Sequence, residues 1–85
     1  MNEEEIGYVS NFMGNISVVI IEMTSGTLET GDTVHFKGRT TDFSETVSSM
    51  QIDHESVDKV KKNDSLGLKV KNKVRKRDKV YKVVD

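Results

Sequence analysis

The chain has 85 residues, no cysteine and no proline, and its formal net charge is −1. A chain of this length forms one small domain that buries about 60% of the surface its unfolded form exposes, which leaves little room for a deep catalytic cleft. The lack of cysteine excludes disulfides and thiolate zinc sites and fits a reducing compartment.

The N-terminal sequence MNEEEIGYVSNFM is acidic and lacks the basic and apolar regions of a signal peptide. The longest purely apolar run, Val18 to Ile21, is far shorter than the roughly 20 residues that span a bilayer. We therefore expect a soluble, cytoplasmic protein without membrane contact. Its acidic residues 1–5 are expected to form a flexible tail, and residues 6–85 a single domain.

Short runs of β-branched residues with period-2 alternation predict strands along most of the chain. The expected strands are residues 6–13, 16–23, 33–37, 44–52, 66–71 and 79–84. The fourth keeps its alternation only if a β-bulge lies near Ser48. Val57 and Val60 lie three residues apart, which fits a short helical turn or an irregular loop. Six or seven short strands without a helical period predict an all-β fold, a small antiparallel Greek-key barrel.

Catalytic, metal and nucleotide sites find little support in the sequence. Gly26 to Thr33 has the glycine spacing of a phosphate-binding loop, but Asp32 stands where that loop needs a lysine. The neighbours Asp53, His54 and Glu55 would point to alternating faces of a strand, so they do not converge on one atom. We therefore expect no enzymatic activity, no metal, no nucleotide and no cofactor.

Charge is divided unevenly between the two parts of the chain. Residues 1–58 carry two Lys/Arg and eleven Asp/Glu, a net charge of −9, whereas residues 59–85 carry eleven and three, a net charge of +8. The two parts either neutralise each other within the fold or form an interaction surface for an acidic partner. Opposite-charge faces would also allow self-association.

The basic residues near the C-terminus are the strongest candidate for a binding surface. If the strand that starts at Leu66 continues, three lysines share one face about 7 Å apart, a spacing that can follow a phosphate backbone. The alternative is a solvated edge guarded by lysines. The candidate nucleic-acid or partner-binding residues are Lys69, Lys71, Lys73, Arg75, Lys76, Arg77 and Lys79.

Four short stretches carry a resemblance to a known family: GDTVHF from Gly31, VSSMQ from Val47, HESVDKV from His54 and DSLGLKV from Asp64. In this order they resemble the second domain of translational GTPases of the elongation factor Tu type, and small stand-alone elongation factor-like proteins. A similar barrel also occurs at the C-terminus of some collagenase-like peptidases. The chain departs from the family's Gly-Asp turns at Asn63 and at Arg77, and arginine fits poorly if φ is positive there.

The resemblance implies a non-catalytic binding module whose partner is RNA, the ribosome or an acidic protein. The alternative is an accessory subunit of an enzyme such as a collagenase-like peptidase, which would supply in trans the barrel that other peptidases carry fused. In that case a barrel edge or the loop of Arg39, Thr40, Thr41, Asp42 and Phe43 would contact the enzyme.

Overall fold

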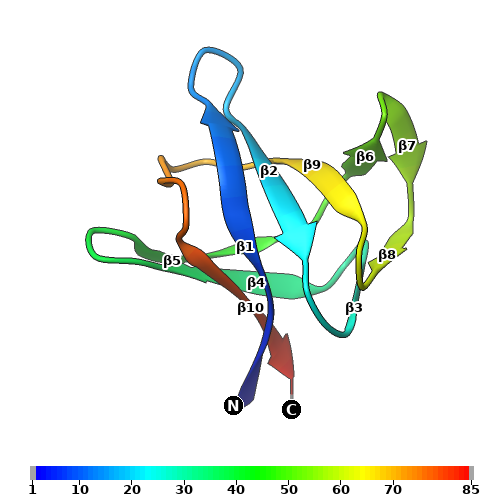
Figure 1. Cartoon of the computed structure of the whole chain (residues 1–85), viewed down its shortest axis with the longest axis horizontal. Coiled ribbons are helices and arrows are strands. Elements are labelled where there is room, and N and C mark those ends of the chain that lie inside the picture. Colours follow the sequence, from blue (N-terminus) through cyan, green and yellow to red (C-terminus); the bar gives the residue numbers. More distant parts are fainter. Residues whose placement is uncertain (1, 85) are drawn as a thin grey trace.

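The computed structural model describes residues 2–84, which form ten β-strands (Figure 1). No helix among these residues is long and apolar enough to cross a membrane. The strands are β1 (Asn2–Met13), β2 (Val18–Met23), β3 (Thr27–Glu29), β4 (Thr33–Lys37), β5 (Asp42–Thr46), β6 (Met50–Ile52), β7 (Glu55–Val57), β8 (Lys59–Lys61), β9 (Ser65–Lys69) and β10 (Lys79–Val84).

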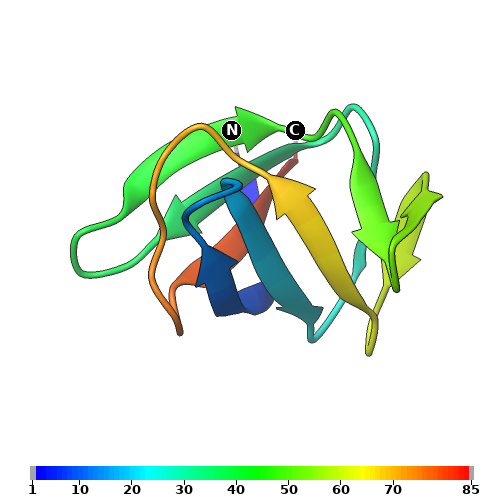
Figure 2. The ribbon, with the colours of Figure 1, turned by 90° about the horizontal axis from the view of Figure 1, so that it is seen from above.

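Eight of the strands form one antiparallel sheet in the order β5-β4-β10-β1-β2-β9-β6-β7, and β3 pairs with β8 in a second, two-stranded sheet. The large sheet curls around the interior, as Figure 2 shows from above. Strand β1 pairs with β10 on one side and with β2 on the other, and its register shifts at two points, between Glu5 and Gly7 and between Val9 and Asn11. Such bulges increase the twist of a strand and help a sheet to curve.

Alternating apolar residues of the strands fill the interior of this curled sheet. Strand β2 buries every second residue, and Val34 and Phe36 do the same in β4. The two-stranded sheet contributes Leu28 and Val60, both with 1% exposure or less. One face of each strand therefore supports a common core, while the outer faces remain free to carry charge.

The prediction of an all-β, antiparallel fold is confirmed, but the number and limits of the strands differ. The expected strand 44–52 is two strands, because residues 47–49 leave the sheet between β5 and β6. Val47 is buried there, and its amide and carbonyl bond to Asp32 and Gly31 instead of to a neighbouring strand. A β-bulge at Ser48 is therefore wrong. Residues 55–61 form β7 and β8 and not a helical turn, and β3 was not expected.

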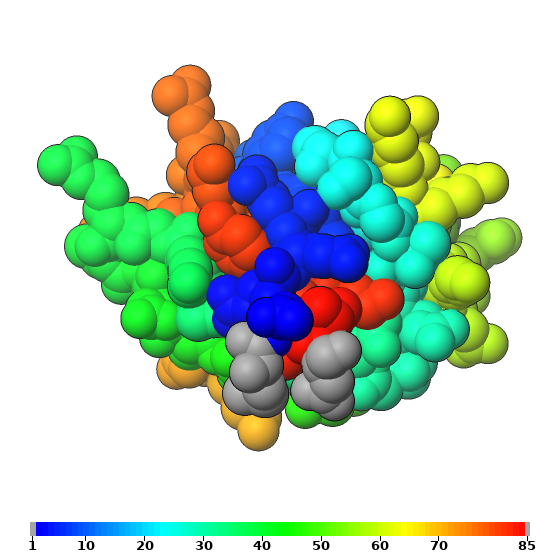
Figure 3. Space-filling view, turned by 90° about the horizontal axis from the view of Figure 1, so that it is seen from below, coloured from blue at the N-terminus to red at the C-terminus, as the bar shows by residue number. Residues whose placement is uncertain are grey.

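The acidic N-terminal residues also differ from the expected flexible tail. Asn2 to Glu5 belong to β1 and pair with residues 81–84 of β10, whereas residue 1 lies outside the described residues. Figure 3 shows the start of β1 and the end of β10 side by side on one face. Acidic side chains are compatible with a strand here because this face of β1 lies beside lysines and a histidine of β4 and β10.

Candidate functional site

Three turns with the same hydrogen bonds precede strands β4, β9 and β10, at residues 29–32, 61–64 and 75–78. In each turn the fourth residue is an aspartate, and its amide donates to the carbonyl of the first residue over 3.0–3.1 Å. The aspartate carboxylate accepts a hydrogen bond from the amide of the first residue at 2.9 Å. Each turn is therefore closed twice, once by backbone and once by the side chain of Asp32, Asp64 or Asp78.

The third residue of each turn has a positive φ angle, which is 98° at Gly31, 78° at Asn63 and 75° at Arg77. Its amide donates to the carbonyl of a buried apolar residue, and the amide of that residue donates to the aspartate carbonyl. The buried residues in question are Val47, Met23 and Val9. The turns are thus anchored to the core, and the arginine is confirmed to occupy a backbone conformation that it disfavours.

The basic C-terminal stretch is a loop over most of its length. Strand β9 ends at Lys69, and the next residues turn inward, since Val70 and Val74 are buried. The amide of Lys71 donates to the carboxylate of Glu45 at 2.9 Å. The expected row of lysines on one strand face is therefore wrong, because the buried valines bend the chain away from the sheet between Lys69 and Lys73.

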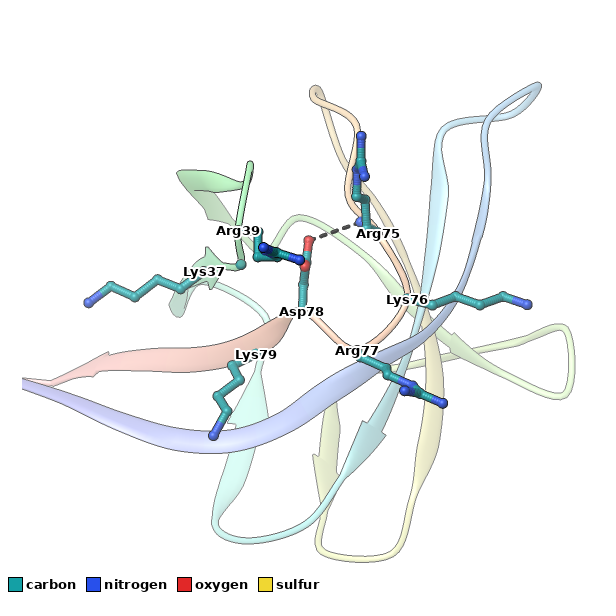
Figure 4. Close-up of a pocket in the computed structure, with 8 residues that line it drawn as sticks. Lys37, Arg39, Arg75, Lys76, Arg77, Asp78 and Lys79 are labelled. Carbon is teal, nitrogen blue, oxygen red and sulfur yellow. Dashed lines mark hydrogen bonds between the residues drawn. The ribbon is translucent and has the colours of Figure 1, made fainter.

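The second half of this stretch forms one wall of a groove of about 630 Å³. The other wall comes from the end of β4 and the start of the β4–β5 hairpin, so two stretches far apart in sequence meet (Figure 4). The lining residues are six Lys/Arg, one aspartate and one glycine: Lys37, Gly38, Arg39, Arg75, Lys76, Arg77, Asp78 and Lys79. We call this feature the basic groove. Four of the seven predicted binding residues, Arg75, Lys76, Arg77 and Lys79, line it, whereas Lys69, Lys71 and Lys73 do not.

The remaining residues of the predicted contact loop have structural contacts. Thr41 is 5% exposed, and its carbonyl accepts a hydrogen bond from the amide of Gly38 at 2.8 Å. The ring of Phe43 packs on that of Phe36 with 5.2 Å between centroids. Asp42 pairs with His35, and Thr40 is exposed. Only Arg39 of this loop lies in the groove.

His35 lies between two carboxylates on the outer face of β4. Its Nδ1 is 2.5 Å from Oε2 of Glu3 and its Nε2 is 2.5 Å from Oδ1 of Asp42. The hydrogen bond to Glu3, and then that to Asp42, raises the pKa of the His35 imidazole, because both carboxylates favour the charged ring. The same histidine, with help from Lys37, lowers the pKa of Glu3. This cluster ties β1 to β4 and β5.

His54, the other histidine, lies in the hairpin turn between β6 and β7, where both Asp53 and His54 have positive φ angles, of 51° and 68°. It is exposed and lies in the connection after β6. Among residues 2–84 no group of three or more His, Cys, Asp or Glu side chains is arranged to hold a metal ion.

A second groove, of about 380 Å³, is mainly apolar and was not foreseen from the sequence. It lies along the outer face of β2 and is lined by Met13, Ile16, Val18 and Ile20, with Leu66 and Gly67 of β9 opposite. Four polar residues complete the lining: Gln51, Asp53, His54 and Ser65. Ile16 is 51% exposed, unusual for a large aliphatic side chain. The apolar groove was hidden in the sequence because Val18 and Ile20 read as core residues in a strand that is apolar on both faces.

Two crystal structures of the C-terminal domain of a Geobacillus thermoleovorans protein described as a U32 peptidase have the same fold. One superposes with a TM-score of 0.87 and 17% identity and covers 95% of this chain and 93% of that domain. The other, a selenomethionine variant, gives a TM-score of 0.84 with 16% identity over 91% and 96% of the two chains.

A sequence relative is an uncharacterized protease of Methanocaldococcus jannaschii, which is 44% identical over 78 residues. The match covers 91% of this chain but only 19% of the protease, so the chain spans about a fifth of that protein's length. No family model matches the chain.

These comparisons overturn the expected relation to translation elongation factors, since the similar proteins are a protease and a peptidase domain. The resemblance rested on short signals such as Gly31-Asp32 and Asp64-Ser65, and the structure shows their aspartates closing turns. Turn and strand signals of this kind report local backbone geometry, which unrelated functions share.

Proposed function

We propose that this chain is a non-catalytic accessory module of a U32-type peptidase and that it acts by docking on the rest of such an enzyme. The observation that carries the proposal is the 44% identity to a segment that makes up only a fifth of a protease. The shared fold with a C-terminal domain of a protein described as a U32 peptidase supports the same reading. In this proposal the curled sheet is the Greek-key barrel predicted from the sequence.

A binding role is also supported by how the acid–base groups are used. The histidine with a raised pKa, His35, has both ring nitrogens bonded to carboxylates, so neither is free to exchange a proton with a substrate. The two grooves, in contrast, are open surfaces. An accessory module needs such surfaces rather than a converging acid, base and nucleophile.

The apolar groove is the face we assign to the enzyme. A module that occupies a fifth of a longer protein contacts the remainder across a domain interface, and such interfaces have an apolar centre. The exposed Ile16, flanked by the half-buried Val18 and Ile20, supplies that centre. We do not assign the Arg39–Phe43 loop this role, because most of it is occupied in holding the β4–β5 hairpin.

A pull-down of the tagged protein from lysate of its own cells, with RNase and at high salt, tests this function. The expected result is one stoichiometric peptidase of the U32 type, identified by mass spectrometry, that the Ile16→Asp variant no longer captures. Ser44→Asp, an exposed change on β5, is the matched control and should capture it normally. Capture that is unaffected by Ile16→Asp, or no peptidase in the wild-type eluate, contradicts the proposal.

A further inference from the structure

The basic groove carries cations that the fold itself does not neutralise. Lys37 pairs with Glu3 at 3.2 Å and Lys79 with Glu5 at 3.6 Å. The other four, Arg39, Arg75, Lys76 and Arg77, are exposed and form no ion pair with any residue from 2 to 84. The acidic and basic parts of the chain therefore neutralise each other only in part, and four of the cations without an ion pair among residues 2–84 line this groove.

Arg77 occupies its turn at a conformational cost, because its φ angle is positive, at 75°. Its turn has the same hydrogen bonds as the turns at 29–32 and 61–64, where the equivalent positions are glycine and asparagine. Glycine and asparagine tolerate a positive φ angle, whereas arginine is strained there by about 1 kcal/mol or more. Strain at one of three equivalent turns, and at the one that lines the groove, points to a role for the guanidinium rather than for the backbone.

An exposed aromatic side chain stands next to the groove. Tyr8 of β1 lies opposite Lys79 of β10, which in turn lies opposite Lys37 of β4. Directly opposed residues of antiparallel strands present their side chains on the same face about 5 Å apart. This row faces outward, because the next residues in β10 and β4, Val80 and Phe36, are buried. Tyr8 is 42% exposed, so its ring is open to a flat partner.

We propose that the basic groove and Tyr8 form a binding site for single-stranded nucleic acid. The cationic side chains point in different directions around the groove instead of converging on one point (Figure 4). Such a spread fits a chain of phosphates better than a single anion. Three of the four unpaired cations are arginines, and one planar guanidinium group can donate two parallel hydrogen bonds to the oxygens of a phosphate. The tyrosine provides the stacking surface that bases require and that an acidic peptide would not use.

This site is separate from the apolar groove, so the module can hold an enzyme on one surface and a nucleic acid on the other. The two proposals also fail in different ways. Docking through Ile16 is apolar and is measured at high salt with RNase, whereas phosphate binding weakens as salt rises, with a slope of about −0.7 in log affinity per contact. For the four unpaired cations the expected slope is about −3.

The test is fluorescence anisotropy of labelled oligouridylate and oligodeoxythymidylate with the full chain at several salt concentrations. We expect saturable binding, with a salt slope reduced by about 0.7 in Arg77→Gly. That variant relieves the strained backbone, so a loss of binding in it reflects the missing guanidinium and not a disturbed fold. Asn63→Gly makes the equivalent change in another turn and should bind as the wild type does. Tyr8→Ala should weaken binding about fivefold or more, and Tyr8→Phe should retain it.

A preference between the two oligonucleotides assigns the strand type. The proposal is overturned if neither oligonucleotide binds at low salt, or if Arg77→Gly and Tyr8→Ala bind as the wild type does. It is also overturned if polyglutamate competes as well as the oligonucleotides, since the groove would then be a surface for acidic polypeptides.

Discussion

The three aspartate turns allow one structural interaction to be measured in three environments within a single chain. In each turn a carboxylate accepts an amide hydrogen bond at 2.9 Å, but its burial differs, and the carboxylate of Asp32 also lies 3.6 Å from Nζ of Lys82. Asp78 is 6% exposed, Asp32 has 23% of its side chain exposed, and Asp64 is partly exposed. Replacing each aspartate by alanine removes the acceptor and leaves the amide of the first turn residue to find water.

The expected cost depends on whether water can reach that amide. A hydrogen bond to a charged group contributes about 1.5–3 kcal/mol, and the upper value applies where the orphaned donor remains buried. We therefore expect Asp78→Ala to lower the free energy of unfolding by about 3 kcal/mol, and Asp32→Ala and Asp64→Ala by about 1.5 kcal/mol each. For a domain of this size, these losses correspond to decreases in Tm of roughly 12–24 °C and 6–12 °C.

Urea and thermal unfolding followed by far-ultraviolet circular dichroism measure these values. The corresponding asparagine variants keep an acceptor oxygen and should lose less than half as much. Asp58→Ala removes an exposed carboxylate that has no side-chain hydrogen bond among the described residues and is the control. If Asp78→Ala is no more destabilising than Asp58→Ala, or if the order of the three turns is reversed, the assignment of the carboxylate bond as the stabilising element is refuted.

Three further predictions concern the glycines and the histidine of the sheet. Gly7→Ala should prevent folding or lower stability by about 3 kcal/mol, because its Cβ would lie 2.2 Å from the backbone oxygen of Glu22; loss of the native circular dichroism spectrum checks this. Gly38→Ala should cost about 2 kcal/mol because its Cβ would lie 2.0 Å from Oδ1 of Asp78, and the same change should cost clearly less in an Asp78→Ala background, as a double-mutant cycle in urea would show. His35→Gln should lower the free energy of unfolding most at pH values between the ordinary pKa of glutamate and that of histidine. In this pH range the imidazole ring is charged and is bonded to two ionised carboxylates. The difference from wild type should shrink as pH rises through the raised pKa of His35, and a constant difference up to pH of about 9 would contradict the pairing.

Much of the fold was predictable because its strands obey simple alternation. Val34 and Phe36 alternate with polar residues in β4, and the structure buries both. Residues 44–52 were predicted as one bulged strand but form two strands, β5 and β6, at different positions in the sheet. A β-bulge and a short connection between two strands both shift the alternation of apolar residues by one, so the sequence pattern does not distinguish them. The distinction lies in the backbone bonds of Val47, which depend on a turn 15 residues earlier in the chain.

The basic groove was only half visible in the sequence. The run of lysines and arginines is apparent in the sequence, but its backbone path is set by Val70 and Val74, which are buried. In the sequence these two valines look like unimportant apolar residues within a charged segment. The sequence does not indicate that Arg39 lines the groove, because this depends on the β4–β5 hairpin lying beside the turn at residues 75–78. Sequence order cannot supply that neighbour, because it follows from β10 pairing with β4.

The position of β10 has a consequence for how the chain reaches its native state. This last strand lies inside the large sheet, between β4 and β1, and Asn2 pairs with Val84. The sheet therefore cannot be completed during synthesis until residues near 84 have left the ribosome. Until then β4 and β1 are unpaired edges that can join strands of other chains. Pairings between segments so distant in sequence also form slowly. Nascent and truncated forms of this domain are therefore expected to aggregate more readily than the complete domain.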